Sequence, residues 1–428
     1  MLDPKFIREN LDHVKKNISD RSVEADPDRA VFLYEERNRI IQELEALRSK
    51  RNENAARMKK KPSPEERESL IAEGKRLKEQ IPELEGKLSE LEEALNQELK
   101  RIPNMAHPDA PVGGDEASNK EIRVLGSPTT FDFSPKDHVE LGQALDIIDF
   151  DTATKVAGTK FYYLKNEAVF LEFALSRYAM DVLVRHGFTP TITPDIARQE
   201  VAAGIGFNPR GEESNIYNLE GEDTCLVGTA EITLGGYYAN TILEAEMLPI
   251  RMAGFSHCFR REAGAAGQFS KGLYRVHQFS KVEMFVYCRP EESEAIHQEL
   301  LAIEEEIFNG LEVPYRIVDT ATGDLGAPAY RKFDLEAWMP GRGDGGDWGE
   351  VTSASNCTDY QARRLGVRFR EEKDKRLVHM LNGTAIAISR AIIAVLENHQ
   401  QADGSIRIPK ALQHYFGGDR IGPRVAAG

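Results

Sequence analysis

A cluster of charged and aromatic residues lies between positions 258 and 284, and its spacing is that of a β-hairpin. Arg260 and Glu262 are two residues apart, so both side chains are expected on one face of an extended segment. On the returning segment, alternate residues share one face, and these are Phe279, Lys281 and Glu283. Arginines suit phosphate oxygens, and an aromatic ring offers a flat apolar face for a base. The hairpin therefore predicts a site for an anionic, planar and partly cationic ligand, such as a nucleotide bound beside an amino acid.

A glycine-rich loop joins the two segments of this hairpin. Its glycines are Gly264, Gly267 and Gly272, and its cations are Arg261, Lys271 and Arg275. The alternative is an amphipathic hairpin whose polar face is simply exposed to water, which is common in antiparallel sheets. The rest of the chain has to decide between these two interpretations.

The composition is that of a globular protein with two or three domains. Of the 428 residues, 41% are hydrophobic and 29% are charged. No apolar run approaches the roughly 20 residues that span a bilayer. The four cysteines form no C-x-x-C pair and the N-terminus lacks the apolar core of a signal peptide, so we expect a cytoplasmic protein with reduced thiols and no membrane partner. The net charge of −15 argues against indiscriminate nucleic-acid binding, whereas a local basic patch is compatible with one specific RNA.

Residues 30 to about 102 have the pattern of two antiparallel helices that form a coiled coil. In the second half, apolar residues follow steps of three and four, which is a heptad seam: Leu70, Leu77, Ile81, Leu84, Leu88, Leu91 and Leu95. The weaker seam of the first half consists of Leu33, Ile40, Ile41, Leu44, Leu47 and Met58. In the turn between them, Ser63 is expected to cap the second helix, with Pro64 at its first position and Glu66 completing a capping box. Pro82 is expected to kink or break this helix.

The end of the helical hairpin is basic. Its cations are Arg48, Lys50, Arg51, Arg57, Lys59, Lys60 and Lys61. They are either ordinary solvated charges on a helix or a surface that follows a phosphate backbone, and the second interpretation predicts strong salt dependence.

Residues 103–135 are rich in Pro, Gly, Asp and Asn and predict a linker. From residue 136 to 428, helical and β-rich segments alternate and are joined by loops, so we expect an α+β domain whose antiparallel sheet is flanked by helices. The expected helices are 138–148, 168–186 and 384–399, and the expected strands are 189–192, 252–259, 276–287 and 315–318. Residues 341–349 are dense in glycine but lack the features of a P-loop, and we expect a flap there.

Several motifs, taken in sequence order, resemble those of the class II seryl-tRNA synthetases, and the resemblance covers almost the whole chain. Residues 1–10, the helical hairpin and residues 102–107 resemble the N-terminal region of that family. The stretches similar to the three motifs that define the class are residues 186–194, 258–284 and 382–390. The first of these motifs forms a dimer interface in the family. Residues 228–232 and 353–364 are similar to stretches typical of the serine enzymes.

The resemblance implies a serine–tRNA ligase that forms seryl-adenylate from L-serine and ATP and then transfers serine to tRNA(Ser). It implies Mg²⁺ as a cofactor and tRNA(Sec) as a second acceptor, by resemblance only. It also implies a homodimer. Residues 1–102 would bind tRNA, reading its shape and backbone, and residues 136–428 would form the catalytic domain.

In this reaction a carboxylate attacks the α-phosphorus of ATP, so catalysis consists mainly of positioning two anions and neutralising their charge. The resemblance assigns catalysis to Arg260, Glu350 and Arg390. It assigns ATP binding to Arg260, Arg261, Glu262, Val276, Phe279, Glu350, Val351, Thr352, Ser353 and Arg390. Arg260 would hold the α-phosphate, Arg390 the γ-phosphate and Phe279 the adenine ring. Glu350 and Ser353 would hold Mg²⁺, which prefers oxygen ligands.

The resemblance assigns the serine substrate to Thr229, Ala230, Glu231, Glu283 and Thr384. Glu231 and Glu283 would bring negative charge to the serine ammonium. A site that hydrogen-bonds the substrate hydroxyl rejects alanine, because polar groups of the site would then be left unpaired.

Besides Pro82 in the helical hairpin, the chain departs from the family pattern at three positions. Gly228 stands where proline is common, and Ala385 and Ser389 stand where small glycines are usual. His257 and His277 adjoin the hairpin without a partner at matching spacing, so we expect packing residues there and not acid–base catalysts.

Two other functions stay open. The chain could make seryl-adenylate and deliver serine to a carrier or a small amine. In that case the helical hairpin of residues 30 to about 102, here also called the arm, should be shortened or missing. The chain could also be an inactive coiled-coil scaffold, which should lack one of Arg260, Glu283, Glu350 and Arg390. The arm and all four residues are present.

Overall fold

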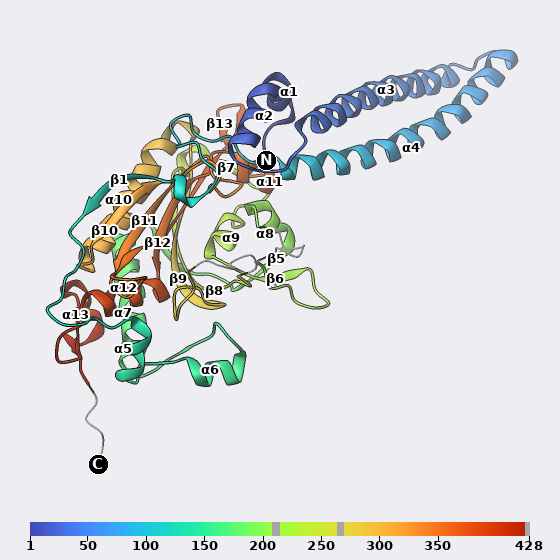
Figure 1. Cartoon of the computed structure of the whole chain (residues 1–428). Helices are drawn as coiled ribbons and strands as arrows, with labels where there is room; N and C mark the ends of the chain where they lie inside the picture. The colour runs from blue at the N-terminus through green and yellow to red at the C-terminus, as the bar shows by residue number, and fades with distance from the viewer. Residues whose placement is uncertain (208–214, 263–268, 424–428) are drawn as a thin grey trace. The chain divides into compact units, whose positions relative to one another are not determined.

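The computed structural model describes residues 1–207, 215–262 and 269–423 (Figure 1). Gly264 and Gly267 of the predicted loop lie outside this range. The chain divides into two compact units, residues 1–105 and 106–428, and each is described by itself. Within the described residues, none of the helices combines the length and the apolar composition that a membrane crossing requires.

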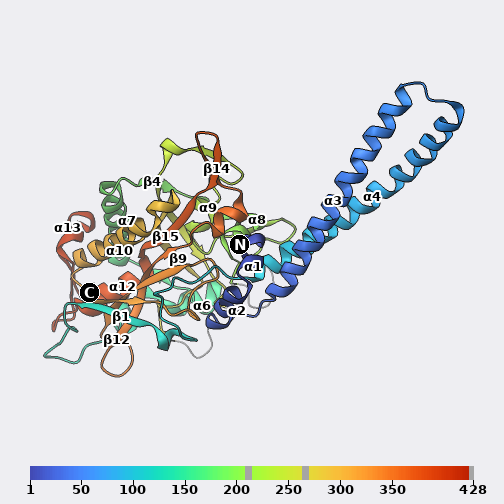
Figure 2. The same cartoon turned by 90° about the horizontal axis from the view of Figure 1, so that it is seen from above.

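The first unit is helical. It consists of α1 (Pro4–Glu9), α2 (Leu11–Asp20), α3 (Pro27–Lys59) and α4 (Pro64–Arg101). Helices α3 and α4 lie side by side in both views (Figures 1 and 2), which confirms the predicted helical hairpin. Ile40, Leu44 and Ile81 pack together in the seam between them. The buried Asn54 donates to the carbonyl of Leu70 at 3.0 Å, and a buried polar contact of this kind fixes the register of a coiled coil.

The turn between α3 and α4 follows the prediction in part. The hydroxyl of Ser63 accepts a hydrogen bond from the backbone N–H of Glu66 at 3.3 Å, and Pro64 begins the helix. The second half of the predicted capping box is wrong, because the Glu66 carboxylate accepts from Arg57 at 2.7 Å instead. Of the two predicted effects of Pro82, the break is wrong, since α4 continues through this residue, while the kink stays a prediction. Packing of α4 along α3 offsets the one hydrogen bond that a proline removes.

The second unit is built on an eight-stranded sheet. Across the sheet the strands are β1 (Lys120–Leu125), β10 (Tyr315–Asp319), β11 (Arg331–Met339), β12 (Asp347–Asn356), β15 (His379–Ala387), β9 (Gln278–Cys288), β8 (Ile250–Phe259) and β4 (Thr189–Ile192). All neighbours are antiparallel except β4 and β8, which are parallel. The predicted antiparallel sheet is thus confirmed. Strand β1 lies within residues 103–135, so part of the segment expected as a linker belongs to the sheet.

The sheet is surrounded by helices and short strands. The helices are α5 (His138–Ala144), α6 (Phe150–Ala157), α7 (Glu167–Arg185), α8 (Gln199–Ile205), α9 (Ala230–Gly235), α10 (Ser293–Gly310), α11 (Tyr360–Leu365), α12 (Ile388–Asn398) and α13 (Lys410–Phe416). The 3-10 turns are Glu116–Ser118, Ala245–Met247 and Pro290–Glu292. The short strands are β2 (Ile148–Asp149), β3 (Tyr163–Leu164), β5 (Ile196–Arg198), β6 (Thr224–Leu226), β7 (Ile242–Glu244), β13 (Arg368–Glu371), β14 (Asp374–Leu377), β16 (Ile406–Arg407) and β17 (Arg420–Ile421).

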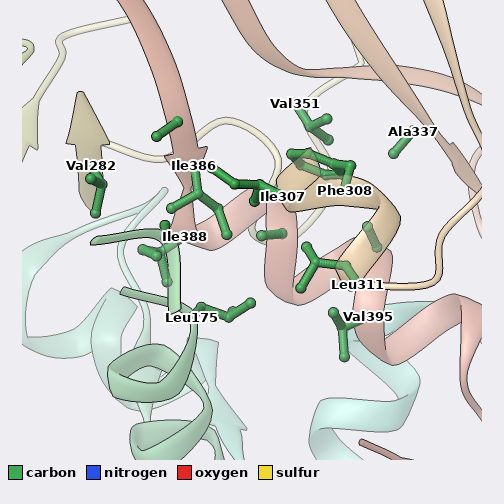
Figure 3. Packing of buried hydrophobic residues seen from close by; sticks show 14 of the residues in the cluster. Leu175, Val282, Ile307, Phe308, Leu311, Ala337, Val351, Ile386, Ile388 and Val395 are labelled. Atoms are coloured by element: carbon green, nitrogen blue, oxygen red, sulfur yellow. The ribbon is translucent and has the colours of Figure 1, made fainter. Parts of the chain in front are cut away.

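The main core lies between one face of the sheet and helices α7, α10 and α12. Figure 3 shows Leu175 of α7, Ile307 of α10 and Val395 of α12 gathered with Val351 and Ile386 of the sheet. Along β9, the even-numbered residues Val282, Met284 and Val286 enter this core. The odd-numbered residues of β9 face the opposite side, as the alternation in the sequence predicts.

The helix near the C-terminus begins later than predicted. Residues 384–387 complete strand β15, and α12 starts only at Ile388. The apolar run of this region does not distinguish a buried strand from a buried helix, because both are covered on every side. A further helix, α13, follows α12.

Candidate active site

A pocket opens on the face of the sheet formed by the odd-numbered residues of β9. It contains about 860 Å³ of space, open solvent included. The predicted site residues that line it are Thr229, Glu231, Arg260, Glu262, Val276, Phe279, Glu283, Glu350, Val351, Thr352, Ser353, Thr384 and Arg390. Two predicted residues do not line it. Ala230 is buried among apolar side chains, and Arg261 is exposed.

A β-bulge in β12 allows Glu350 and Ser353 to share the pocket face. Residues three apart in a regular strand point to opposite faces. Here residues 350–352 stand opposite two residues of β11, so Val351 is an extra residue and the alternation shifts by one. The Val351 side chain packs into the core although the residue borders the pocket, while Glu350 and Ser353 line the pocket.

The neighbouring strand β15 contains a second bulge. Thr384 pairs with Glu283 of β9, and the next pairing starts only at Ile386, which leaves Ala385 without a partner on β9. Ala385 and Ile386 both enter the core. Thr384 and Ala387, three residues apart, therefore both line the pocket.

Arg260 lies just beyond the end of β8, between the two strands of the hairpin. Its Nε donates to the carbonyl of Gly228 at 3.1 Å, and its guanidinium carbon lies 5.4 Å from the centroid of the Phe279 ring. The backbone of Arg260 is bonded to His277 twice. Its N–H donates to the His277 carbonyl at 3.0 Å, and its own carbonyl lies 2.8 Å from the His277 ring nitrogen Nδ1. Arg260 is thus fixed at both its backbone and its side chain.

Glu262 reaches the pocket by a route that the sequence did not predict. Strand β8 ends at Phe259, and Glu262 has a left-handed backbone with φ of 51°, so the expected extended segment through this residue is wrong. Its carboxylate forms an ion pair with Arg275 at 3.2 Å. This ion pair connects the segment that follows β8 to the segment that precedes β9.

Arg390, in the first turn of α12, is held by Tyr274 and Glu350. Its Nε donates to the Tyr274 carbonyl at 3.3 Å, and its guanidinium carbon lies 4.6 Å from the centroid of the Tyr274 ring. Its Nη1 donates to the Glu350 carbonyl at 2.9 Å and lies 3.3 Å from the Glu350 carboxylate. The guanidinium is thus oriented by two carbonyls, a ring and a carboxylate.

The Glu350 carboxyl has a lowered pKa. Burial alone would raise the pKa, but the positive charges of Arg390, Lys332 and Arg260 outweigh burial. Glu350 is therefore ionised near neutral pH.

A second group of residues, deeper in the pocket, surrounds the Glu283 carboxylate. One oxygen of Glu283 accepts from the hydroxyl of Thr229 at 3.2 Å and from that of Thr384 at 3.5 Å. Lys281 forms an ion pair with the same oxygen, and both charged side chains are almost fully buried. Thr229 has two roles, because its hydroxyl also accepts from the backbone N–H of Glu231 at 3.2 Å and so caps α9.

Glu231 stands beside this group. Its carboxylate accepts from Gln361 at 2.8 Å and from Asn382 at 3.0 Å. Burial and the neighbouring Glu283 raise the pKa of Glu231 to about 7, against the opposing effects of Gln361 and Lys281. The pocket thus has a cationic end at Arg260 and Arg390 and an end rich in carboxylates and hydroxyls.

Comparison with known proteins identifies the family of the chain. The family described as seryl-tRNA synthetase N-terminal domain matches residues 1–106, and the tRNA synthetase class II core domain (G, H, P, S and T) matches residues 216–399. The serine–tRNA ligase of Treponema denticola is 64% identical, over 99% of this chain and 100% of the relative. That of Rubrobacter xylanophilus is 56% identical over 99% of both. The chain belongs to the seryl-tRNA synthetase family.

Among solved structures, the seryl-tRNA synthetase of Pyrococcus horikoshii in complex with ATP matches with a TM-score of 0.92 and 44% identity. The match covers 99% of this chain and 100% of that chain. The cytoplasmic serine–tRNA ligase of Naegleria fowleri in complex with AMP matches with a TM-score of 0.87 and 30% identity, over 99% of both chains.

The sequence did not predict several residues of this pocket. They include Tyr274, Asn382 and Ser355. Tyr274 had no signal in the sequence, since its contact with Arg390 depends on where α12 begins. Lys281 also lines the pocket, on the face that its alternation with Phe279 and Glu283 predicts.

The departures from the family pattern have small structural consequences at two positions. Gly228 contributes its carbonyl to Arg260, and any residue supplies a carbonyl. The side chain of Ala385 enters the core and points away from the pocket. The ring nitrogen Nδ1 of His257 lies 2.9 Å from the Asp195 carboxylate, and Nδ1 of His277 lies within hydrogen-bond distance of the Arg260 carbonyl.

Proposed function

We propose that the chain is a serine–tRNA ligase. It joins L-serine to ATP as seryl-adenylate, with release of pyrophosphate, and transfers serine to tRNA(Ser). The observation that carries this proposal is the division of one pocket into an arginine-lined end and an end with two carboxylates and two threonine hydroxyls. The names of the relatives described above agree with it.

The arginine-lined end is proposed to bind ATP. Arg260 holds the α-phosphate, and its positive charge also neutralises the serine carboxylate that attacks phosphorus. Arg390 holds the γ-phosphate, and the Phe279 ring stacks on adenine. Since each guanidinium is oriented before ATP arrives, little reorganisation is needed in the transition state.

The other end is proposed to bind serine. The carboxylates of Glu231 and Glu283 attract the ammonium group, and Thr229 and Thr384 surround the substrate with hydroxyls. Alanine is excluded because the polar groups of the site that bind the serine hydroxyl would lose their partner. Threonine is excluded because the site has no room for its additional methyl group. The second discrimination is weaker, because one methyl group contributes only roughly 1–3 kcal/mol.

The donor groups of β12 fit Mg²⁺. The Glu350 carboxylate and the Ser353 hydroxyl are oxygen donors on one face of the strand, next to Arg390. Mg²⁺ binds through one or two carboxylates together with substrate phosphates and retained waters. When bound, the ion would neutralise phosphate charge, and Glu350 and Ser353 would hold it.

The partners are proposed from two surfaces. Phe173 of α7 and Ile192 of β4 are 64% and 83% exposed, and with Phe255 they line an apolar hollow suited to a second copy of the chain. Helices α3 and α4 are proposed to hold tRNA(Ser), with tRNA(Sec) as a further acceptor. The four free cysteines agree with a cytoplasmic location.

Two assays on the full chain test the function. We expect serine-dependent exchange of pyrophosphate into ATP, and charging of tRNA(Ser) with serine. Exchange followed by serine transfer to a small amine, without tRNA charging, would support the carrier-type enzyme instead. Absence of exchange at saturating serine, ATP and Mg²⁺ would leave only the inactive scaffold.

A further inference from the structure

A buried pair of side chains, His138 and Glu397, connects three segments behind the arginine-lined end of the pocket. The His138 side chain is 2% exposed and that of Glu397 is 1% exposed. Glu397 Oε1 lies 2.7 Å from His138 Nδ1 and accepts from the backbone N–H of His138 at 3.0 Å. Glu397 Oε2 accepts from the backbone N–H of Gly341 at 2.8 Å. On the far side of the ring, the backbone N–H of Leu273 donates to His138 Nε2 at 3.1 Å.

These contacts fix the proton on the ring. Nε2 must be unprotonated, because it accepts from the N–H of Leu273. Nδ1 must then carry the hydrogen, and it donates this hydrogen to the Glu397 carboxylate. Glu397 thus sets the tautomer that allows His138 to accept from the hairpin.

The backbone packs tightly around this pair. A Cβ added at Gly272, whose φ is 56°, would lie 2.1 Å from His138 Nε2. One added at Gly341 would lie 2.5 Å from the Cβ of Asp137. Lys271 forms an ion pair with Asp137 beside them. Residues 271–273 of the hairpin and Gly341 of the β11–β12 turn are therefore held against the start of α5.

The residue after Leu273 is Tyr274, which orients Arg390. The Tyr274 ring contacts two guanidinium groups, since the guanidinium carbons of Arg342 and Arg390 are each 4.6 Å from its centroid. Its carbonyl accepts from Arg390, and its hydroxyl donates to the Glu350 carbonyl at 3.3 Å. Any shift of the backbone at residue 273 would be transmitted to this stack.

We propose that His138 and Glu397 are positioning residues for the ATP-binding end of the pocket. They hold the backbone at Leu273, and through it Tyr274 and Arg390, in the arrangement that receives the terminal phosphates of ATP. Neither residue lines the pocket, so they act without touching the substrates. This inference rests on the proposed ATP-binding role of Arg390.

Two substitutions of one residue separate positioning from simple packing. In His138→Asn the amide NH₂ can replace Nδ1 as donor to Glu397, but the buried N–H of Leu273 loses its acceptor. In His138→Gln the amide oxygen can replace Nε2 and accept from Leu273. We expect His138→Asn to raise the KM for ATP and the Kd for ATP about tenfold, with the KM for serine unchanged. His138→Gln should restore most of the ATP affinity.

His399→Asn is the matched control. His399 is also buried, and its Nε2 lies 2.8 Å from the Leu311 carbonyl while its Nδ1 accepts from Arg407 at 2.9 Å. The substitution removes the Nε2 contact and can retain the other, away from the pocket. We expect a lower melting temperature and an unchanged KM for ATP.

The measurements are pyrophosphate exchange for KM and calorimetry for ATP binding. The inference is overturned if His138→Asn binds ATP as the unaltered protein does, if His138→Gln is no better than His138→Asn, or if the KM for serine rises equally. If the unaltered protein binds ATP but shows no exchange, the proposed function fails while the ATP Kd still tests the positioning role. If it binds no ATP, both fail.

Discussion

Nη1 of Arg390 lies 3.3 Å from the Glu350 carboxylate in the lining of the pocket, and the same guanidinium donates to the Glu350 carbonyl at 2.9 Å. Arg390 comes from the first turn of a largely buried helix, whereas Glu350 precedes the bulge in β12. The pair therefore joins the two elements that border the proposed phosphate site. An interior arginine that is already oriented by a carboxylate needs little rearrangement to receive an anion.

Replacement of Arg390 by lysine tests this arrangement. Lysine retains the charge but cannot make the bidentate and stacking contacts of a guanidinium. We expect kcat/KM for ATP in pyrophosphate exchange to fall by about 10²-fold or more, in the range for loss of one transition-state donor. Arg420→Lys, at an exposed arginine paired with Asp403, is the control and should leave exchange unchanged. Equal activity of Arg390→Lys and the unaltered chain would contradict the proposed role.

The raised pKa of Glu231 predicts a pH dependence of serine binding. Below its pKa of about 7 the carboxyl is largely neutral and attracts the serine ammonium less, so the KM for serine should be higher at pH 6 than at pH 8. Glu231→Gln should raise the KM for serine at pH 8 and flatten this dependence, since the glutamine does not titrate. The KM for ATP, measured in the same series, serves as the internal control. A serine KM that changes with pH equally in both proteins would exclude Glu231 as the titrating group.

The sequence predicts the strands of the hairpin well because a half-buried strand has a clear period of two. Phe279, Lys281 and Glu283 line the pocket, and Val282 and Met284 enter the core, as the alternation requires. The same reasoning fails at Glu262, because a left-handed residue after the strand has no signature in polar spacing. The helical arm is predictable for a similar reason, since its heptad seam is local in sequence.

The bulges at Val351 and Ala385 show a second limit of sequence reasoning. A bulge changes which side chains share a face, and it is defined only by the pairing with a neighbouring strand. Glu350 and Ser353, at a spacing of three, would be assigned to opposite faces by alternation alone. Only the resemblance to the family grouped them before the structure did.

Glu304 of α10 predicts a pH dependence of stability. It is fully buried behind the sheet, where one oxygen accepts from Thr352 at 3.0 Å, and burial raises its pKa well above the usual value. Between the unfolded pKa of about 4.3 and the raised native pKa, the folded protein therefore holds a proton that the unfolded chain has released. The free energy of unfolding should then fall as pH rises from about 4.3 toward the native pKa of Glu304.

Glu304→Gln removes this contribution. The glutamine amide resembles the protonated acid and does not titrate. We therefore expect the difference in melting temperature between the variant and the unaltered chain to shift in favour of the variant as the pH is raised from 5 to 8. Glu294→Gln, at an exposed position of the same helix, should show no such gain. A difference between the two melting curves that does not vary with pH would mean that Glu304 is ionised in the folded protein.

The basic end of the α3–α4 hairpin predicts that its substitution affects the charging of tRNA but not pyrophosphate exchange, which reports formation of seryl-adenylate. Arg48 and Arg57 are each paired with a glutamate at 2.7 Å, whereas Lys50, Arg51, Lys59, Lys60 and Lys61 are exposed, with no acidic partner in the fully described helical unit. Such unpaired cations are available to phosphates, and each phosphate contact adds to the salt dependence of binding. Replacing these five residues by glutamine should raise the KM for tRNA(Ser) and weaken its dependence on salt. Pyrophosphate exchange should not change, because the pocket lies in the other unit.

The control for this variant replaces Lys373 and Lys375, two exposed lysines on the β13–β14 hairpin, by glutamine. It lowers the positive charge of the catalytic unit but leaves the arm intact. Charging by this control should match the unaltered chain across a salt series. If both variants charge tRNA(Ser) equally well at every salt concentration, the cations at the end of the arm are solvated surface charges and the tRNA is held elsewhere. If charging and exchange fall together in the five-residue variant, the predicted separation between tRNA charging and pyrophosphate exchange is contradicted.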